Sequence, residues 1–318
     1  MTEPPAACWI CLDEAPDAAG GRYHRACLVS LFGVPEAPRI AFDQLEIASW
    51  ADDHAGKLSI SGQQPKGPAA LSDDGATLIL VESDSTHIVK PPQISPAHTV
   101  ENEHLTMRLA RLAGLDVAEH GLIELRDGAV AYVTRRFDRP SGKTGPPVHV
   151  VDFCQLAGKQ PEDKAESSAE ECAALAREYA VPGAALTLFH MFIFSYWVRN
   201  GDLHLKNLML LQQPNQEEYV MSPAYDLLCT QPYEANHWGM MLPLRGEKRN
   251  LPRRLWLDFA EIDCGLDRAQ AAAAIDAMLA RLPDAMALIE RSRGPSPAWK
   301  LRYARWLKKR TRQLAGLV

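Results

Sequence analysis

The chain has 318 residues, of which 47% are hydrophobic and 23% are charged. It can therefore bury a large core, and its length is compatible with one bilobed catalytic unit or with two domains. The formal net charge of -6 argues against a protein that coats nucleic acid through bulk charge, although a local basic patch could still bind it. Composition indicates an enzyme-sized globule and identifies no partner.

Signals for secretion or membrane insertion are not evident. The first residues, Met1 to Pro5, lack the basic and apolar stretches of a secretion signal. The most apolar run, 184–198, is interrupted by polar residues and is too short to span a bilayer. Seven scattered cysteines, an odd number, fit reduced thiols better than a disulfide framework. We expect a soluble cytoplasmic protein with no membrane contact.

Residues 1–42 are interpreted as a small N-terminal element that contains a Cys/His pattern. Cys8, Cys11, His24 and Cys27 have C-x2-C-x12-H-x2-C spacing. These side chains could hold zinc in a closed tetrahedral site and stabilise a segment too short for its own core. Small buried cysteines without a metal are also common, so both alternatives stay open.

Residues 43–140 predict a small lobe that is mainly β. Short apolar runs at 58–62, 76–81 and 86–90 alternate with turn residues, as in an antiparallel sheet. We interpret this lobe as the nucleotide-binding part of the chain.

A helix and a hairpin complete this lobe. The helix is expected over 97–113, where leucines recur at helical spacing and Gly114 provides a stop signal. Residues 121–137 predict a hairpin that turns at Arg126-Asp127-Gly128. The Gly/Pro-rich connector 140–147 is the expected lobe boundary.

Residues 141–318 predict a larger, mainly helical lobe. Ser168 and Glu171 form a capping-box pattern, and 184–199 indicates a helix that is buried on most sides. The segment 266–289 is Ala-rich and amphipathic. The expected fold is therefore α+β and bilobed, with a mainly β N-lobe and a mainly α C-lobe.

The C-terminus is basic. It could contact tRNA, DNA held by a partner or an acidic protein face, or it could form a solvated helix face. Three aromatic residues at helical spacing, Trp299, Tyr303 and Trp306, favour docking of this helix on its lobe over stacking on bases. The basic residues are Lys300, Arg302, Arg305, Lys308, Lys309, Arg310 and Arg312.

One polar loop and a later aspartate carry the most informative chemical pattern. The loop reads Asn200-Gly201-Asp202-Leu203-His204-Leu205-Lys206-Asn207. Phosphoryl transfer needs a carboxylate near the acceptor hydroxyl and oxygen ligands for magnesium, which Asp202, Asn207 and Asp226 supply. Short strands are expected at 208–211 and 219–221. The pattern favours the catalytic and metal loops of a kinase; the alternative is a polar loop that caps a buried helix.

Three weaker elements lie upstream in the order that a kinase requires. The polar run 59–66 could bring backbone N–H groups close to phosphates, or it could be a plain β-turn. Lys90 could neutralise phosphates, or it could be a solvated charge at a strand end. Glu101 or Glu103 could pair with Lys90, or could merely suit the helix dipole. Their order along the chain makes the match to a kinase more specific than any one element does.

Together these motifs resemble the HipA/HipT family of bacterial toxin kinases. The resemblance covers residues 58–230, with plausible helical similarity onward to the end. Its motifs are Ser59-Ile60-Ser61-Gly62-Gln63 with Lys66, His87-Ile88-Val89-Lys90-Pro91, Glu101-Asn102-Glu103, Arg136-Phe137-Asp138-Arg139, Asp152-Phe153-Cys154-Gln155, the 200–207 loop and Ala224-Tyr225-Asp226-Leu227.

The resemblance implies an ATP-dependent serine/threonine-protein kinase with a role for each matching residue. Asp202 would orient or deprotonate the substrate hydroxyl, and His204 would brace the loop. Asn207 and Asp226 would hold magnesium, and Lys90 would bind the phosphates of ATP. The other nucleotide contacts would come from the Gly-rich loop, the hinge against adenine and the residue before Asp226: Ser61, Gly62, Gln63, Lys66, Arg135, Arg136, Phe137 and Tyr225.

The resemblance also implies self-regulation. In this family a serine of the Gly-rich loop is autophosphorylated, and Ser59 and Ser61 offer two such sites here. A phosphate adds about two negative charges where the phosphates of ATP must sit. Autoinhibition is the expected consequence.

Partners follow from the resemblance to the shorter HipT-type toxins, since fewer than sixty residues precede the loop. It implies a three-component system with a HipS-like small subunit and a HipB-like antitoxin, in which DNA is contacted only through the antitoxin. The expected substrate is an aminoacyl-tRNA synthetase.

Two other functions stay open. One is a small-molecule kinase of the aminoglycoside phosphotransferase type, which uses a similar Asp/Asn/Asp set but does not need the Ser59-Ile60-Ser61 motif. The other is a catalytically silent module that uses zinc and the basic tail to bridge an antitoxin and nucleic acid. The presence of Lys90, Asp202, Asn207 and Asp226 weighs against the silent module, because binding alone does not require all four.

Overall fold

The computed structural model describes residues 7–14, 21–53, 64–140, 142, 145–212, 217–233 and 239–317. The chain divides into two compact units. Unit 1 comprises Met1–Leu105, Ala118–Pro147 and Arg291–Pro295, and unit 2 comprises Thr106–Val117, Val148–Glu290 and Ser296–Val318. The division into three parts at residues 42 and 140 stays a prediction.

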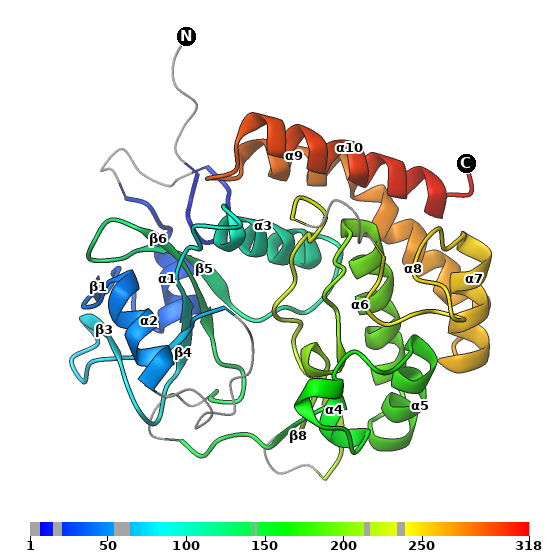
Figure 1. Ribbon diagram of the computed structural model, residues 1–318, viewed down its shortest axis with the longest axis horizontal. Helices are drawn as coiled ribbons and strands as arrows, with labels where there is room; N and C mark the ends of the chain where they lie inside the picture. Colours follow the sequence, from blue (N-terminus) through cyan, green and yellow to red (C-terminus); the bar gives the residue numbers. More distant parts are fainter. Residues whose placement is uncertain are drawn as a thin grey trace. The chain divides into compact units, whose positions relative to one another are not determined.

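Unit 1 is built on a six-stranded sheet in the order β1-β3-β2-β4-β6-β5 (Figure 1). β1 is parallel to β3, and the other neighbouring pairs are antiparallel. The strands are β1 (Arg39–Ile40), β2 (Gly67–Leu71), β3 (Thr77–Leu80), β4 (His87–Lys90), β5 (His120–Glu124) and β6 (Val130–Arg135).

The strand predictions at 76–81 and 86–90 are confirmed by β3 and β4. The hairpin prediction is confirmed by β5 and β6, whose turn contains Gly128 in a left-handed conformation (φ 83°) that favours glycine. The strand predicted at 58–62 lies outside the described residues.

Helices α1 (Arg25–Phe32) and α2 (Gln44–Asp53) pack their apolar residues against this sheet. The core of unit 1 combines residues of these helices with strand residues and with Cys8 and Ile10 of the N-terminal element. The segment predicted to be too short for its own core thus shares the core of unit 1. The helix predicted at 97–113 is α3 (Thr99–Leu112), and the division between the two units falls within it.

Unit 2 is mainly helical and also contains a three-stranded antiparallel sheet in the order β7-β8-β9. Its elements are β7 (Val150–Asp152), α4 (Phe153–Leu156), η1 (Pro161–Asp163), α5 (Ala169–Tyr179), α6 (Ala184–Val198), η2 (Leu205–Asn207), β8 (Met209–Gln212), β9 (Tyr219–Met221), α7 (Arg253–Asp258), the π-helical turn η3 (Phe259–Asp263), α8 (Arg268–Ala280), α9 (Leu282–Arg291), whose last residue belongs to unit 1, and α10 (Pro297–Leu314).

Helix α6 is the central helix of unit 2 and contacts α5, α8 and α10 (Figure 1). Twelve of its residues are buried, as predicted, and the rings of Phe189 and Phe192 pack against Phe259. Ser168 caps α5 by accepting a hydrogen bond from the Glu171 backbone N–H, which confirms one half of the predicted capping box. The Glu171 carboxylate accepts a hydrogen bond from Ser167 Oγ at 2.7 Å. This packing fixes the C-terminal end of α6, where the polar loop begins.

One basic residue of helix α10, Arg310, does not lie on a solvated face as the sequence allowed. Trp299 and Tyr303 are buried, as expected for a docked helix, but Arg310 is also buried, with 2% of its surface exposed. The spacing of Tyr303, Leu307, Arg310 and Leu314 places this arginine on the buried face of the helix.

The structure confirms the α+β fold class, with a mainly β unit and a mainly helical unit. Among the described helices, none combines the length and the apolar character needed to cross a membrane.

Candidate functional site

Lys90 forms a buried ion pair with Glu103 in unit 1. Lys90 ends β4, and its Nζ lies 2.7 Å and 2.9 Å from the two carboxylate oxygens of Glu103 on α3. The side chains are only 9% and 5% exposed, and the ammonium also lies over the ring of Tyr132. Of the two glutamates left open by the sequence, Glu103 pairs with the lysine, while Glu101 lies 3.8 Å from His98.

Lys66 is at the same end of the sheet as Lys90. The register pairs Gly67 with Val89, and its extension by one residue places Lys66 opposite Lys90. The nearby Gln64 donates through Nε2 to the Pro91 carbonyl at 3.2 Å. The other residues predicted for the Gly-rich loop, Ser59, Ser61, Gly62 and Gln63, lie outside the described residues.

The residues predicted to form the adenine hinge directly follow β6 or end it. The guanidinium of Arg136 forms a bidentate ion pair with Asp138 at 3.0 Å and 2.6 Å and donates to Ser85 Oγ at 2.8 Å. Arg135 donates to the Ser30 carbonyl at 3.2 Å. Both side chains therefore hold the segment in place, and a hinge role would fall to the backbone and to Phe137.

In unit 2, the polar loop starts where α6 ends in a left-handed turn at Arg199 (φ 59°). The Asn200 side chain accepts a hydrogen bond from the Asp202 backbone N–H at 3.0 Å. The Gly201 N–H donates to Thr230 Oγ1 at 3.0 Å. These bonds hold the backbone that leads into the Asp202 Cα and so restrict the position of its carboxylate.

Asn207 and Asp226 lie side by side although they are nineteen positions apart in the sequence. Asn207 Nδ2 donates to Asp226 Oδ2 at 3.2 Å, and Asn207 Oδ1 accepts from the His204 N–H at 3.1 Å. The Tyr225 hydroxyl donates to the Lys206 carbonyl at 2.6 Å. Asp226 has a left-handed backbone (φ 57°), which is uncommon for a residue other than glycine and recurs at functional sites.

His204 is a buried residue of the polar loop. Burial lowers the pKa of its imidazole to about 4, because the charged form would lose its hydration. The ring is therefore neutral at pH 7. This agrees with a positioning role and not with a cationic one.

Asp152 contacts the polar loop from outside it, and the sequence analysis did not predict this contact. It caps α4 through a reciprocal capping box with Gln155, and its Oδ2 lies 3.6 Å from Lys206 Nζ in the polar loop. The Asp-x-x-Gln spacing in the sequence signals the cap. The partner from a distant loop has no comparable local signal.

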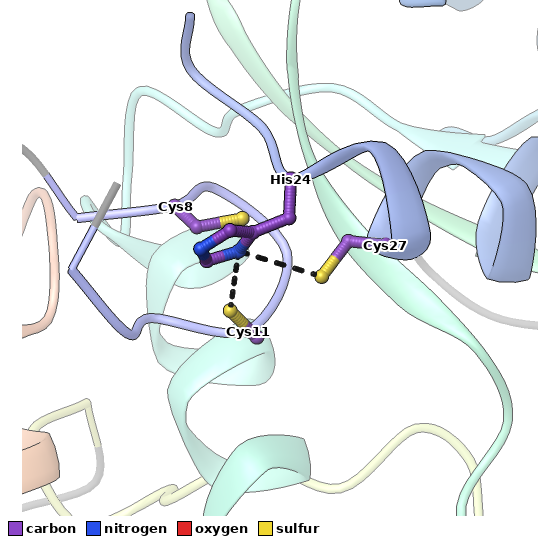
Figure 2. Close-up of side chains that lie close together, drawn as sticks. All are labelled: Cys8, Cys11, His24 and Cys27. Atoms are coloured by element: carbon purple, nitrogen blue, oxygen red, sulfur yellow. Dashed lines mark hydrogen bonds between the residues drawn. The ribbon is translucent and has the colours of Figure 1, made fainter. Parts of the chain in front are cut away.

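The Cys/His pattern forms a cluster in unit 1 (Figure 2). His24 Nδ1 lies 3.2 Å from Cys11 Sγ and 3.7 Å from Cys27 Sγ. The thiol interaction with Cys11 is the main cause that lowers the pKa of Cys8 to about 4, and the same interaction raises the pKa of Cys11. One thiolate is thus favoured within the cluster.

Comparison with known proteins shows the family. The model of the HipA-like C-terminal domain matches residues 58–286, which include the Lys90–Glu103 pair and the whole polar loop. The chain belongs to this family. The resemblance found in the sequence motifs is confirmed.

Relatives in this family carry kinase names. The chain is 37% identical over 187 residues to Y4mE of Sinorhizobium fredii, which is named a kinase, and the match covers 56% of this chain and 43% of the relative. It is 31% identical over 199 residues to the serine/threonine-protein kinase toxin HipA of Shewanella oneidensis, with 56% and 44% covered. The chain thus matches less than half the length of these two relatives.

A solved structure supports the same relationship. HipA of Shewanella oneidensis, in a complex with HipB and operator DNA, superposes with a TM-score of 0.68 and 25% identity, covering 81% of this chain and 65% of the HipA chain. The fold is therefore that of HipA-like kinases.

Proposed function

We propose that this chain is a serine/threonine-protein kinase that transfers the γ-phosphate of ATP to a protein hydroxyl. The contact of Asp226 with Asn207, at the end of the polar loop that holds Asp202, carries the proposal. Asp202 would orient or deprotonate the acceptor hydroxyl, as phosphoryl transfer requires. The buried Lys90–Glu103 pair supports it, because a carboxylate that holds the ammonium in one position prepares it for phosphates.

Magnesium fits the donor set of unit 2. Asp226 offers a carboxylate and Asn207 an amide oxygen, the hard ligands that magnesium prefers. In the present arrangement Asn207 directs its amide nitrogen to Asp226, so shared binding of one ion requires the amide to turn over. When bound, magnesium would neutralise charge on the phosphates of ATP.

Unit 1 would supply contacts to the nucleotide. Lys66 and Lys90 would meet the phosphates, and Arg135, Arg136 and Phe137 would form the hinge against adenine. The Tyr225 hydroxyl is bonded to the Lys206 carbonyl, so its contribution would be to keep the metal loop in place.

The proposed role is that of a toxin in the cytoplasm. The HipA neighbour was solved with HipB and operator DNA, which supports an antitoxin of the HipB type as partner, with DNA bound through it. A HipS-like small subunit and an aminoacyl-tRNA synthetase as substrate complete the proposal. Ser59 and Ser61 would be autophosphorylated and would then reduce ATP binding by charge repulsion. Zinc would be a structural cofactor with no part in phosphoryl transfer.

The test compares wild-type protein with Asp226→Asn after incubation with Mg-ATP. Asparagine tolerates the left-handed backbone at this position, so the variant should fold. It lacks the carboxylate charge that would bind magnesium. We expect transfer to fall on the order of 100-fold or more, which corresponds to the loss of several kcal/mol of charge stabilisation. Intact mass and peptide mapping would locate the phosphate.

The matched control is Asp276→Asn, which removes a carboxylate of α8 that pairs with Arg253 outside the polar loop. It should leave transfer unchanged. Equal transfer by Asp226→Asn and wild type would contradict the proposal. Failure of dephosphorylated wild-type protein to bind ATP would favour the silent binding module instead.

A further inference from the structure

The Cys/His cluster draws four side chains from three places in the chain. Cys8 and Cys11 flank a tight turn, His24 precedes α1, and Cys27 lies in the first turn of that helix. One sulfur or nitrogen atom from each lies within 4.8 Å of all the others. Figure 2 shows the three sulfur atoms gathered around the imidazole ring.

Two distances within this cluster lie close to the edges of a zinc tetrahedron. Zinc bound at about 2.3 Å from sulfur and about 2.0 Å from nitrogen separates its ligands by about 3.5 to 3.8 Å. The distances from His24 Nδ1 to the sulfurs of Cys11 and Cys27 are 3.2 Å and 3.7 Å. All seven cysteines are free thiols, so no ligand is consumed by a disulfide.

The backbone around the ligands is shaped by turns and not by a long helix or strand. The Leu12 N–H donates to the Cys8 carbonyl at 3.0 Å, and Leu12 takes a left-handed conformation (φ 64°) directly after Cys11. The Trp9 N–H donates to the Arg22 carbonyl at 3.0 Å and so aligns the two halves of the ligand set. Residues 7–14 and 21–24, as the structure describes them, contain no helix or named strand, so a bound metal would contribute to the folding of this segment.

The same segment covers the open edge of the sheet. β5 is an edge strand, and its Leu122 N–H donates to the Trp9 carbonyl at 2.9 Å while its carbonyl accepts from the Tyr23 hydroxyl at 3.0 Å. An uncovered edge strand invites pairing with other chains. Arg293 lies 4.6 Å over the Trp9 ring, so the segment also holds residues 291–295 in unit 1.

We propose that Cys8, Cys11, His24 and Cys27 bind a structural zinc ion that fastens the N-terminal element over β5. Four protein ligands close the coordination shell, so this zinc would leave no position for substrate. Three thiolates and one imidazole favour zinc over magnesium, which prefers oxygen ligands.

The test measures metal in the full-length protein, purified without chelators from cells grown with added zinc. We expect about one zinc ion per chain by plasma mass spectrometry. Cys11→Ser removes one of the four ligands and should lose the zinc. Cys11 is only partly buried, so its substitution disturbs packing less than substitution of the buried Cys8. Cys229→Ser, at a buried thiol outside the cluster, is the matched control and should keep it.

A second measurement covers the case in which Cys11→Ser does not fold. Titration of wild-type thiols with a mercurial reagent should release the zinc into a metal-sensitive dye, and melting should occur at a lower temperature afterwards. Stoichiometric iron, the absence of stoichiometric metal, or zinc retained by folded Cys11→Ser would overturn the proposal. Each readout is independent of kinase activity.

Discussion

The ion pair between Lys90 and Glu103 is almost fully removed from water. Breaking such a pair from one side leaves a buried charge uncompensated, whereas apolar replacement of both partners removes that penalty. We therefore expect Lys90→Met to lower the free energy of unfolding by about 3 to 5 kcal/mol. Lys90→Met with Glu103→Leu should regain most of that loss, although neither variant should bind ATP normally.

Urea unfolding of Lys90→Met, of Glu103→Leu and of the double variant would measure the coupling between the two side chains. A double variant as unstable as the sum of the single variants would show that the two side chains contribute independently. The exposed pair of Arg22 and Glu124 provides a comparison, for which a coupling of about 1 kcal/mol or less is expected.

His87 is a second buried titratable residue of unit 1. Its Nε2 lies 2.9 Å from the Leu31 carbonyl, which can only accept, so Nε2 carries the proton of the neutral ring. Burial lowers its pKa from 6.5 to about 4. The unfolded chain therefore binds more protons than the folded chain between these values, and the stabilisation present above pH 6.5 is lost as the pH falls toward 4.

Replacing His87 by glutamine should reduce this acid sensitivity, because the amide can still donate to Leu31 but does not titrate. His87 accounts for up to about 3 kcal/mol of the free energy of unfolding that is lost on acidification. Melting temperatures recorded from pH 7 to pH 4 would check it, with exposed His149→Gln as the control. Parallel pH profiles for wild type and His87→Gln would rule out this explanation.

At the scale of single elements, α10 separates its basic residues by face. Arg310 packs over the Tyr196 ring at 3.9 Å, donates to the Tyr196 hydroxyl and donates to Gln313 Oε1 at 2.9 Å. Lys308 is exposed on the same helix. These arginine contacts join α10 to the central helix α6.

Arg310→Ala should therefore lower stability by about 3 kcal/mol, since it removes packing and leaves the Tyr196 hydroxyl without this donor. Lys308→Ala should change stability by less than about 0.5 kcal/mol. Thermal unfolding of both variants would compare them. Similar melting temperatures would mean that the buried contacts of Arg310 contribute little.

Helix ends show how far local patterns extend. The cap at Ser168 is encoded within four residues, and the sequence located it. The Ala-rich segment 266–289 is divided into α8 and α9 near Pro283, whose ring lacks an N–H for a continuous helix. The pairing of Lys206 with Asp152 joins residues far apart in the chain and has no local pattern.

At the scale of the whole molecule, the two units should respond separately to metal removal. The hydrogen bonds and ring contacts described for the N-terminal element connect it to β5 and to residues 291–295, all within unit 1. On the zinc proposal, chelation should increase hydrogen exchange in β5 and residues 21–32. Helix α6, in the core of unit 2, should keep its protection.

Hydrogen exchange followed by mass spectrometry, with and without a zinc chelator, would measure this difference. Cys229→Ser protein treated in the same way should behave like wild type. A uniform increase over both units would indicate that the metal stabilises the entire chain.

Sequence determined much of this protein because its local signals are strong. Alternating apolar runs, helical periodicity and caps specify the α+β fold, and the order of Lys90, the Glu101-Asn102-Glu103 motif, Asp202, Asn207 and Asp226 indicates the family. Tertiary structure alone decided which glutamate faces Lys90, that Arg310 is buried, and that Cys8, Cys11, His24 and Cys27 come together. Such contacts depend on how distant segments pack, and the spacing of residues along the chain does not specify which distant residues meet.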